Sequence, residues 1–77
     1  MSESRATNYC LNENAQIGGE HEVHRLNSTK GCLPNPENRI VLEWHPNCQS
    51  AVAEARRLYP HLIIDGCYYC IPECHTR

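Results

Sequence analysis

Three cysteines and one histidine lie within the nine residues from Cys67 to His75, near the end of a chain of 77 residues. A chain this short buries only about 60% of the surface that its unfolded form exposes. Such a core rarely supplies more than roughly 3–5 kcal/mol, so small domains usually depend on a metal, a disulfide or an oligomer. The clustered ligand residues therefore predict a cross-linked fold.

The six cysteines of the chain are compatible with a disulfide framework or with a metal site. No apolar run follows Met1, so we expect neither a signal peptide nor a membrane-spanning segment. These features predict a cytoplasmic protein in which thiols stay reduced, and clustered reduced cysteines favour metal binding over disulfides. We expect the metal to be zinc (Zn2+).

The charge balance bears on the kind of partner. Seven Lys and Arg residues stand against nine Asp and Glu residues, and Arg56-Arg57 is the one basic pair. Nucleic-acid-binding proteins usually carry a basic stripe. The charge therefore favours a protein partner over a nucleic acid, and no basic amphipathic segment indicates membrane binding.

Residues 1–20 are rich in Ser, Asn, Glu and Gly and have no hydrophobic period. We predict a disordered N-terminal arm over residues 1–20 and a small metal-binding domain over residues 21–77. Cys10 lies in the predicted arm, and we expect it to be an incidental free thiol without a part in metal binding.

One strand and one helix are predicted in the middle of the chain. Ile40, Leu42 and Trp44 alternate along residues 39–44, which predicts a strand with these side chains on one face and Trp44 in the core. A helix is predicted at about residues 48–59, after an Asn N-cap and before a Pro. Its apolar residues form one stripe: Cys48, Ala51, Val52, Ala55, Leu58 and Tyr59.

A short apolar strand at residues 62–64 and an Asp-Gly turn lead into Cys67-Tyr68-Tyr69-Cys70. A Cys-x-x-Cys pair after a tight turn is typical of a zinc knuckle, because both sulfurs reach one tetrahedral ion at about 2.3 Å. The sequence thus predicts a small α+β zinc-stabilised domain with short β-strands, one helix and a C-terminal zinc knuckle.

Cys67 and Cys70 make up half of a tetrahedral site. Cys32 precedes a loop stiffened by two prolines and is the expected third ligand. The fourth ligand stays open on the residue pattern alone, although Cys74 is close enough in sequence to reach the same ion. The candidates for this position are His24, His45, Cys48, Cys74 and His75.

Cys32, the run Glu37-Asn38-Arg39-Ile40, the helix over residues 51–59 and the closing Cys67/Cys70 pair follow one another along the chain. Over about residues 24–70 this order resembles the metal-binding segment of the Ada-type DNA alkylation-repair regulators, which is also appended to some nucleases. In the nuclease-attached forms a histidine precedes the first cysteine. The resemblance therefore implies His24 as the fourth ligand, which would leave Cys74 free to pair with Cys48 or to face solvent.

The chain departs from that family in ways that bear on activity. In the family, the first cysteine of the early pair accepts a methyl group from a DNA phosphotriester as a zinc thiolate. His24 falls at this position and cannot serve as the acceptor, and it lies farther before Cys32 than the family pattern has it. The resemblance thus implies a zinc fold rather than the repair chemistry.

The sequence contains no evident acid–base pair, phosphate loop or nucleophile triad, so we predict no catalytic residues and do not expect an enzyme. The expected function is a structural-zinc module that mediates a protein or nucleic-acid interaction. The alternative is a reactive zinc-thiolate protein that handles metal, undergoes redox chemistry or accepts alkyl groups, with Cys48, Cys74 or His75 as the working group.

Overall fold

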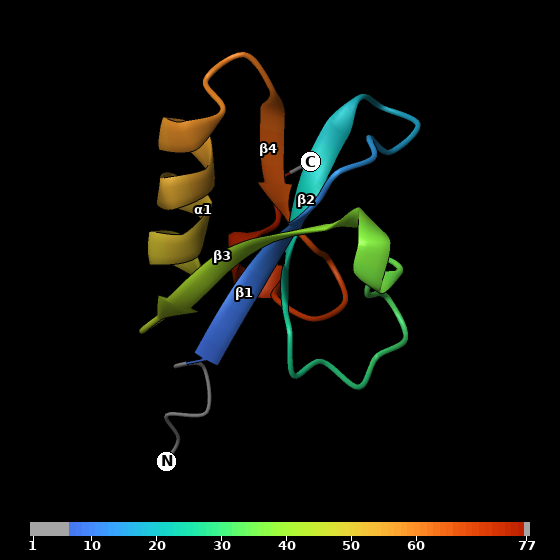
Figure 1. The fold of residues 1–77 in the computed structure, drawn as a ribbon, viewed down its shortest axis with the longest axis vertical. Helices are drawn as coiled ribbons and strands as arrows, with labels where there is room; N and C mark the ends of the chain where they lie inside the picture. Colours follow the sequence, from blue (N-terminus) through green and yellow to red (C-terminus); the bar gives the residue numbers. More distant parts are fainter. Residues whose placement is uncertain (1–6, 77) are drawn as a thin grey trace.

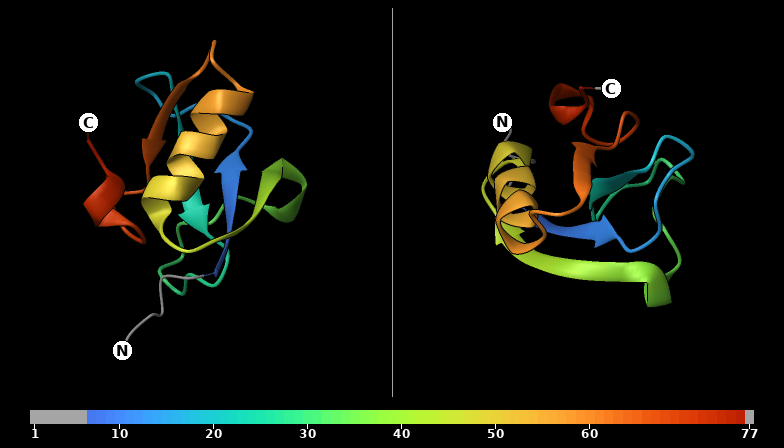
Figure 2. Two further views of the ribbon diagram at one scale, coloured as in Figure 1. Left: turned by 90° about the vertical axis from the view of Figure 1, so that its left-hand side faces the viewer. Right: turned by 90° about the horizontal axis from the view of Figure 1, so that it is seen from above.

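Residues 7–76, which the computed structural model describes, contain a four-stranded sheet with an α-helix packed on one face (Figure 1). The helix lies in front of the sheet when the molecule is turned by 90° about the vertical axis (Figure 2, left). This arrangement confirms the predicted α+β class with one helix and short strands. The elements in chain order are β1 (Thr7–Asn12), β2 (Glu20–Arg25), the 3₁₀ turn η1 (Pro36–Asn38), β3 (Arg39–His45), α1 (Cys48–Leu58), β4 (Ile63–Gly66) and the 3₁₀ turn η2 (Pro72–Cys74).

The strand order in the sheet is β3-β1-β2-β4. β1 is antiparallel to both of its neighbours, whereas β2 and β4 run parallel. Parallel strands end at the same edge of a sheet, so the residues after β4 lie beside the last residues of β2. The Cys67 N–H continues this pairing by donating to the Val23 carbonyl oxygen at 3.0 Å.

The prediction of a disordered arm is wrong for β1. This strand lies inside the sheet, and its residues Tyr9, Cys10 and Leu11 are fully buried. The predicted domain boundary at residue 20 falls within the β1–β2 hairpin, whose turn contains Gly19 at a φ of 92°. The polar residues on both sides of the short Tyr9–Leu11 run hid the strand signal. The remainder of the predicted arm, residues 1–6, lies outside the described residues.

α1 forms where the sequence predicted it. The Asn47 side chain accepts a hydrogen bond from the Ser50 N–H at 2.8 Å, which caps the first turn. Four residues of the apolar stripe are buried against the sheet, whereas Leu58, in the last turn, is 44% exposed. The buried stripe consists of Cys48, Ala51, Val52 and Ala55.

A β-bulge in β3 overturns the prediction that Trp44 belongs to the core. Tyr9 pairs with Glu43 and Cys10 pairs with Val41, so one extra residue of β3 lies between these pairs. Glu43 takes a φ of 71°, and the extra residue reverses the alternation of the side chains that follow. Trp44 is consequently 60% exposed.

Cys48 and Cys74 form a disulfide with a sequence separation of 26 residues. It fastens η2 and the C-terminal segment to the first turn of α1. On loop-closure entropy alone, a cross-link over this separation is expected to stabilise the fold by about 3–4 kcal/mol.

The positive φ of Glu43 generates a test of the bulge. In an ordinary strand position alanine is more stable than glycine by roughly 0.5–1 kcal/mol. At a left-handed residue the Cβ costs about 1–2 kcal/mol, so the Glu43→Gly variant is expected to be at least as stable as Glu43→Ala. Denaturant unfolding of both variants measures the difference.

The matched control is the same pair of substitutions at Val41, an exposed position two residues earlier in β3. There Val41→Ala is expected to be the more stable variant. If alanine is favoured by the same amount at both positions, Glu43 does not hold the left-handed conformation in solution.

Candidate metal centre

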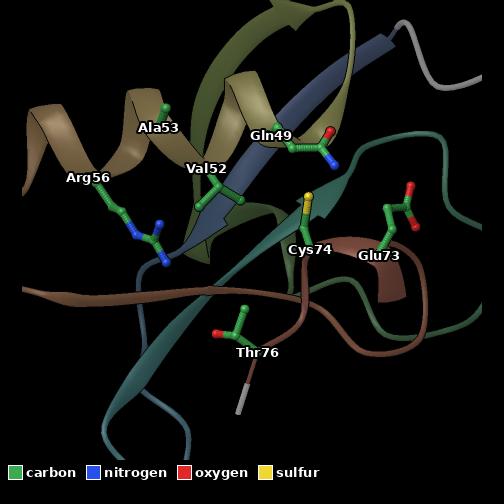
Figure 3. A pocket seen from close by; sticks show the side chains of 7 residues that line it. All are labelled: Gln49, Val52, Ala53, Arg56, Glu73, Cys74 and Thr76. Atoms are coloured by element: carbon green, nitrogen blue, oxygen red, sulfur yellow. The ribbon is translucent and has the colours of Figure 1, made fainter.

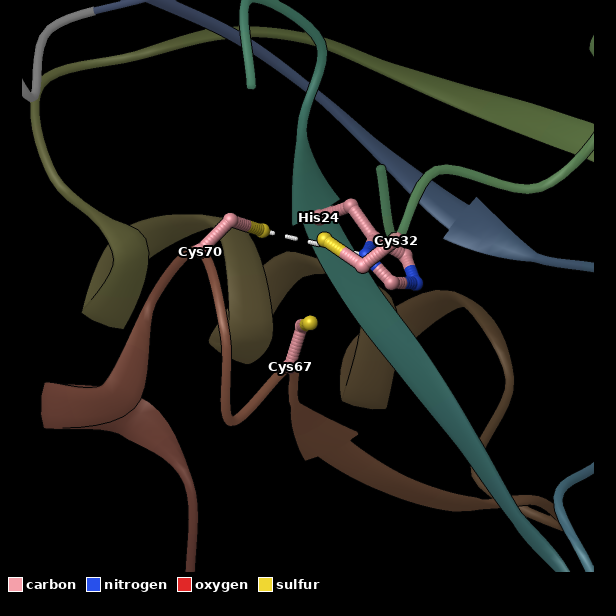
Figure 4. Close-up of side chains that lie close together, drawn as sticks. All are labelled: His24, Cys32, Cys67 and Cys70. Carbon is pink, nitrogen blue, oxygen red and sulfur yellow. Dashed lines mark hydrogen bonds between the residues drawn. The ribbon is translucent and has the colours of Figure 1, made fainter. Parts of the chain in front are cut away.

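Four ligand residues converge at the edge of the sheet where β2 and β4 end (Figure 4). One ligand atom from each of His24, Cys32, Cys67 and Cys70 lies within 4.8 Å of the others. His24, Cys67 and Cys70 are buried, and Cys32 is partly exposed. The structure thus brings together the three cysteines expected from the sequence and the histidine that the family resemblance implied, and a set of this kind can hold a metal ion.

The strand pairing positions the buried members of the cluster. His24 is the penultimate residue of β2, and Cys67 directly follows β4. The chain then turns through Cys70, whose carbonyl oxygen accepts a hydrogen bond from Arg25 Nε at 2.9 Å. The Ile71 N–H donates to the Cys67 carbonyl oxygen at 3.0 Å and closes the turn. Two elements that are far apart in sequence therefore hold three of the four side chains.

Cys32 reaches the cluster from the loop between β2 and β3. Gly31, just before it, has a φ of 77°, a conformation that glycine adopts without a steric cost. Ser28 Oγ lies 3.7 Å from the Cys32 sulfur. Burial raises the pKa of the Cys32 thiol, and the Ser28 hydroxyl opposes this effect.

A hydrogen bond between the two thiols of the Cys-x-x-Cys pair shifts their pKa values in opposite directions. The hydrogen bond between them, together with burial, raises the pKa of Cys67 to about 11. The same hydrogen bond lowers the pKa of Cys70, against the effect of burial. Backbone N–H groups of Tyr69 and Cys70 act in the opposite direction on Cys67, because they stabilise its thiolate and so lower its pKa. Cys70 is thus the more acidic thiol, and the turn supplies N–H donors to a sulfur that a cation would deprotonate.

The separation of His24 and Cys70 fits a tetrahedral metal site. His24 Nδ1 lies 3.7 Å from the Cys70 sulfur. Zinc–nitrogen and zinc–sulfur bonds of about 2.0 and 2.3 Å at the tetrahedral angle place two such ligand atoms about 3.5 Å apart. The observed distance matches one edge of that tetrahedron, with Nδ1 as the histidine atom directed at the cluster.

The other ring nitrogen of His24, Nε2, also has the surroundings expected of a metal-ligating histidine. Among the described residues, His24 Nε2 is a buried side-chain atom without a hydrogen-bond partner. The carboxylate oxygen Oε1 of Glu22 lies 3.9 Å from this nitrogen. A metal-ligating histidine usually donates its other N–H to a carboxylate. With Nδ1 in the cluster and Nε2 directed toward Glu22, the ring is oriented as in a metal-ligating histidine.

Three alternative ligands from the sequence analysis are engaged elsewhere. Cys48 and Cys74 form the disulfide, so neither offers a free thiolate in this structure. His75 Nδ1 lies 3.0 Å from the Gly66 carbonyl oxygen and 3.3 Å from an Asp65 carboxylate oxygen. The disulfide agrees with the inference that Cys74 is free to pair with Cys48 if His24 belongs to the cluster.

His45, the remaining alternative, also lies apart from the cluster. Its Nδ1 hydrogen bonds with Ser50 Oγ at 2.8 Å, and its Nε2 with the Leu42 carbonyl oxygen at 3.0 Å. Both contacts lie at the junction of β3 and α1.

Sequence reasoning missed the proximity of Cys10 to the cluster. Cys10 is a free thiol, as predicted, but it is fully buried and pairs in register with His24 across β1 and β2. Burial raises the pKa of Cys10 to about 11, although the Arg39 guanidinium and, to a smaller extent, the backbone N–H of His24 oppose this effect. Its polar surroundings in the sequence left no signal for this position.

Comparisons with family models, with curated proteins and with solved structures found no match for this chain. Within residues 7–76, no helix has the length and apolar character that crossing a membrane requires.

The Glu22–His24 arrangement generates a prediction. Removal of an outer-shell partner typically costs 10–100-fold in metal affinity, so Glu22→Ala is expected to weaken zinc binding by about 10-fold or more. Glu22→Gln keeps an oxygen acceptor and should lose less. Competition with a chromogenic chelator measures both affinities.

Glu20→Ala removes the same charge from the same strand without removing the carboxylate beside His24, and it serves as the control. Equal zinc affinities for the Glu20→Ala and Glu22→Ala variants would show that Glu22 acts only through its charge or not at all.

Proposed function

We propose that the chain is a small structural-zinc module, with His24, Cys32, Cys67 and Cys70 as the four ligands and its surface as the binding site for a partner. The observation that supports this most is the convergence of four ligand atoms in a mostly buried cluster. Structural zinc sites use four protein ligands, whereas catalytic sites keep a position open. The Ada-type resemblance of the sequence implies the same four ligands.

The donor set favours zinc. Three thiolates and one imidazole form a Cys₃His site, a common tetrahedral zinc set. Calcium and magnesium prefer oxygen ligands, which the cluster lacks among its four members. When bound, the metal would supply a cross-link between β2, the β2–β3 loop and the turn after β4. Structural zinc contributes roughly 10–16 kcal/mol in small peptides, so it would dominate the stability of this domain.

The turn between the two clustered cysteines carries the proposed contact surface. Tyr68 and Tyr69 are 60% and 66% exposed, and their rings lie 5.3 Å apart in an edge-on contact. Tyrosine is enriched in protein interfaces. With a net charge of −2, a protein partner is the favoured choice and a nucleic acid the second. The cluster needs reduced thiols, which is the basis for proposing a cytoplasmic location.

A reactive zinc thiolate remains the second candidate function, and the exposure of Cys32 supports it. Cys32 is the one member of the cluster that is not buried, and it lies on a loop rather than on a strand. An accessible zinc thiolate can accept alkyl groups or exchange metal. Cys32 replaces the working groups that the sequence suggested, since two of those now form a disulfide.

Metal stoichiometry and folding provide the main test. Native mass spectrometry is expected to find one zinc ion per chain, and Cys67→Ser or His24→Ala should lose it. Chelation should collapse the dispersed amide signals of residues 7–76, because the remaining core is small. Cys10→Ser is the control, since it alters a buried thiol beside the cluster and should keep the zinc. Full amide dispersion in the reduced, metal-free protein would contradict the structural role.

Alkylation kinetics separate the two candidate functions. In a structural module, the zinc-loaded protein should react slowly with iodoacetamide at every clustered cysteine. In a reactive thiolate protein, mass spectrometry should find Cys32 modified first and quickly while zinc is still bound. The metal-free protein, in which the thiols are released from the ion, provides the reference rate.

A further inference from the structure

The Cys48–Cys74 disulfide lies next to the candidate metal centre along the chain. Cys48 is the first residue of α1, and Cys74 is the last residue of η2. η2 follows the turn that carries Cys67 and Cys70, and the Cys74 N–H donates to the Ile71 carbonyl oxygen at 2.9 Å. The disulfide therefore anchors the segment on which two of the four clustered ligands lie.

The backbone of Cys74 packs directly against Gly66, the residue before Cys67. A Cβ at Gly66 would lie 2.7 Å from the Cys74 carbonyl oxygen and 2.8 Å from the Cys74 Cβ. His75 Nδ1 hydrogen bonds with the Gly66 carbonyl oxygen at 3.0 Å. This packing holds the end of β4, and thus the start of the Cys-x-x-Cys turn, against the disulfide.

The C-terminal segment after Cys74 is also tied to β4. The Thr76 N–H and hydroxyl donate to one Asp65 carboxylate oxygen at 2.9 and 3.0 Å. The same oxygen accepts the Gly66 N–H at 2.9 Å, and Asp65 is fully buried. A movement of Cys74 would therefore be transmitted to both residues that precede Cys67.

The two disulfide-bonded residues differ in exposure. Cys74 is 9% exposed and lines a cavity of about 260 Å³ between α1 and the C-terminal segment, whereas Cys48 is 1% exposed (Figure 3). An incoming thiol thus reaches Cys74 first. Cys48 would be the leaving group, and its position in the first turn of α1 favours the thiolate form.

We propose that the Cys48–Cys74 disulfide is a redox-responsive link whose reduction loosens the metal centre and speeds metal release. The inference rests on the proposed metal site. It follows from the packing of Cys74 against Gly66 and from the presence of clustered free thiols and one disulfide in the same small domain. In a reducing compartment, a disulfide is usually transient and redox-sensing.

The reaction is a thiol–disulfide exchange with a dithiol reductant. One thiolate of the reductant attacks the Cys74 sulfur, which forms a mixed disulfide and releases Cys48 as a thiolate that takes up a proton. The second thiol of the reductant then attacks the reductant's sulfur in the mixed disulfide. This step releases Cys74 as a thiolate, which takes up a proton. The protein gains two electrons and two protons, and the reductant leaves as its disulfide.

Zinc release from the oxidised and reduced forms of the full chain tests the proposal. A phosphine reductant is used because dithiols bind zinc themselves; with water it yields the phosphine oxide and the same two thiols. Transfer of zinc to a chromogenic chelator is expected to be about 10-fold faster after reduction, comparable to the loss of an outer-shell contact. Mass spectrometry after alkylation confirms the redox state through modification of Cys74.

Two variants act as controls. Cys48→Ser combined with Cys74→Ser should release zinc quickly under both conditions. Cys10→Ser keeps the disulfide and should retain the full dependence on reduction. The comparison of oxidised and reduced wild-type protein stands on its own if the double variant does not fold.

The outcomes separate the two proposals. Absence of bound zinc in both redox states would overturn the proposed function. Bound zinc with equal release rates in both states, or slow release from the double variant, would overturn the redox link and leave the metal site in place. A disulfide that resists reduction in the folded protein would also overturn it.

Discussion

The parallel pairing of β2 with β4 is the contact on which the rest of this structure depends. It joins residues that are about 40 positions apart in the chain and places His24 beside the start of the Cys67–Cys70 turn. Contacts between residues so far apart in sequence carry an entropic cost of loop closure, which favourable interactions at the contact must offset. Burial of Val23 and Ile64 supplies part of it. A metal bound at the end of the two strands would supply far more.

The disulfide and the candidate metal centre connect the C-terminal part of the chain to different elements of the fold. The disulfide joins η2 to α1, while a metal bound by the cluster would join the turn after β4 to β2 and to the β2–β3 loop. The two cross-links share the short segment from Gly66 to Cys74. A glycine at position 66 is required there, since a side chain would collide with the Cys74 backbone. The disulfide and the cluster therefore constrain the same short backbone segment.

Local patterns predicted the elements that depend on neighbouring residues. The Asn N-cap, the apolar stripe and the Pro after Tyr59 delimit α1, and Cys-x-x-Cys marks the turn, because each signal lies within a few residues. Tertiary effects hid the rest. β1 has only three buried residues between polar ones. The bulge at Glu43 contains no glycine, the residue that usually indicates a positive φ in a sequence. The Cys48–Cys74 disulfide was one open possibility in the sequence, and a Cα–Cα distance of 6.4 Å is what makes it feasible.

The choice of His24 over Cys74 in the cluster has a physical reason that sequence distance could not supply. Cys74 is only four residues from Cys70, yet its sulfur bonds to Cys48 in the first turn of α1. His24 is 46 residues from Cys70 but lies on the neighbouring strand, with Nδ1 at 3.7 Å from the sulfur. The pairing of β2 with β4 places His24 in the cluster, whereas the 3₁₀ turn η2 directs Cys74 away from it. The same turn places the Cys74 sulfur in the disulfide, so the ligand set and the disulfide are two results of one backbone path.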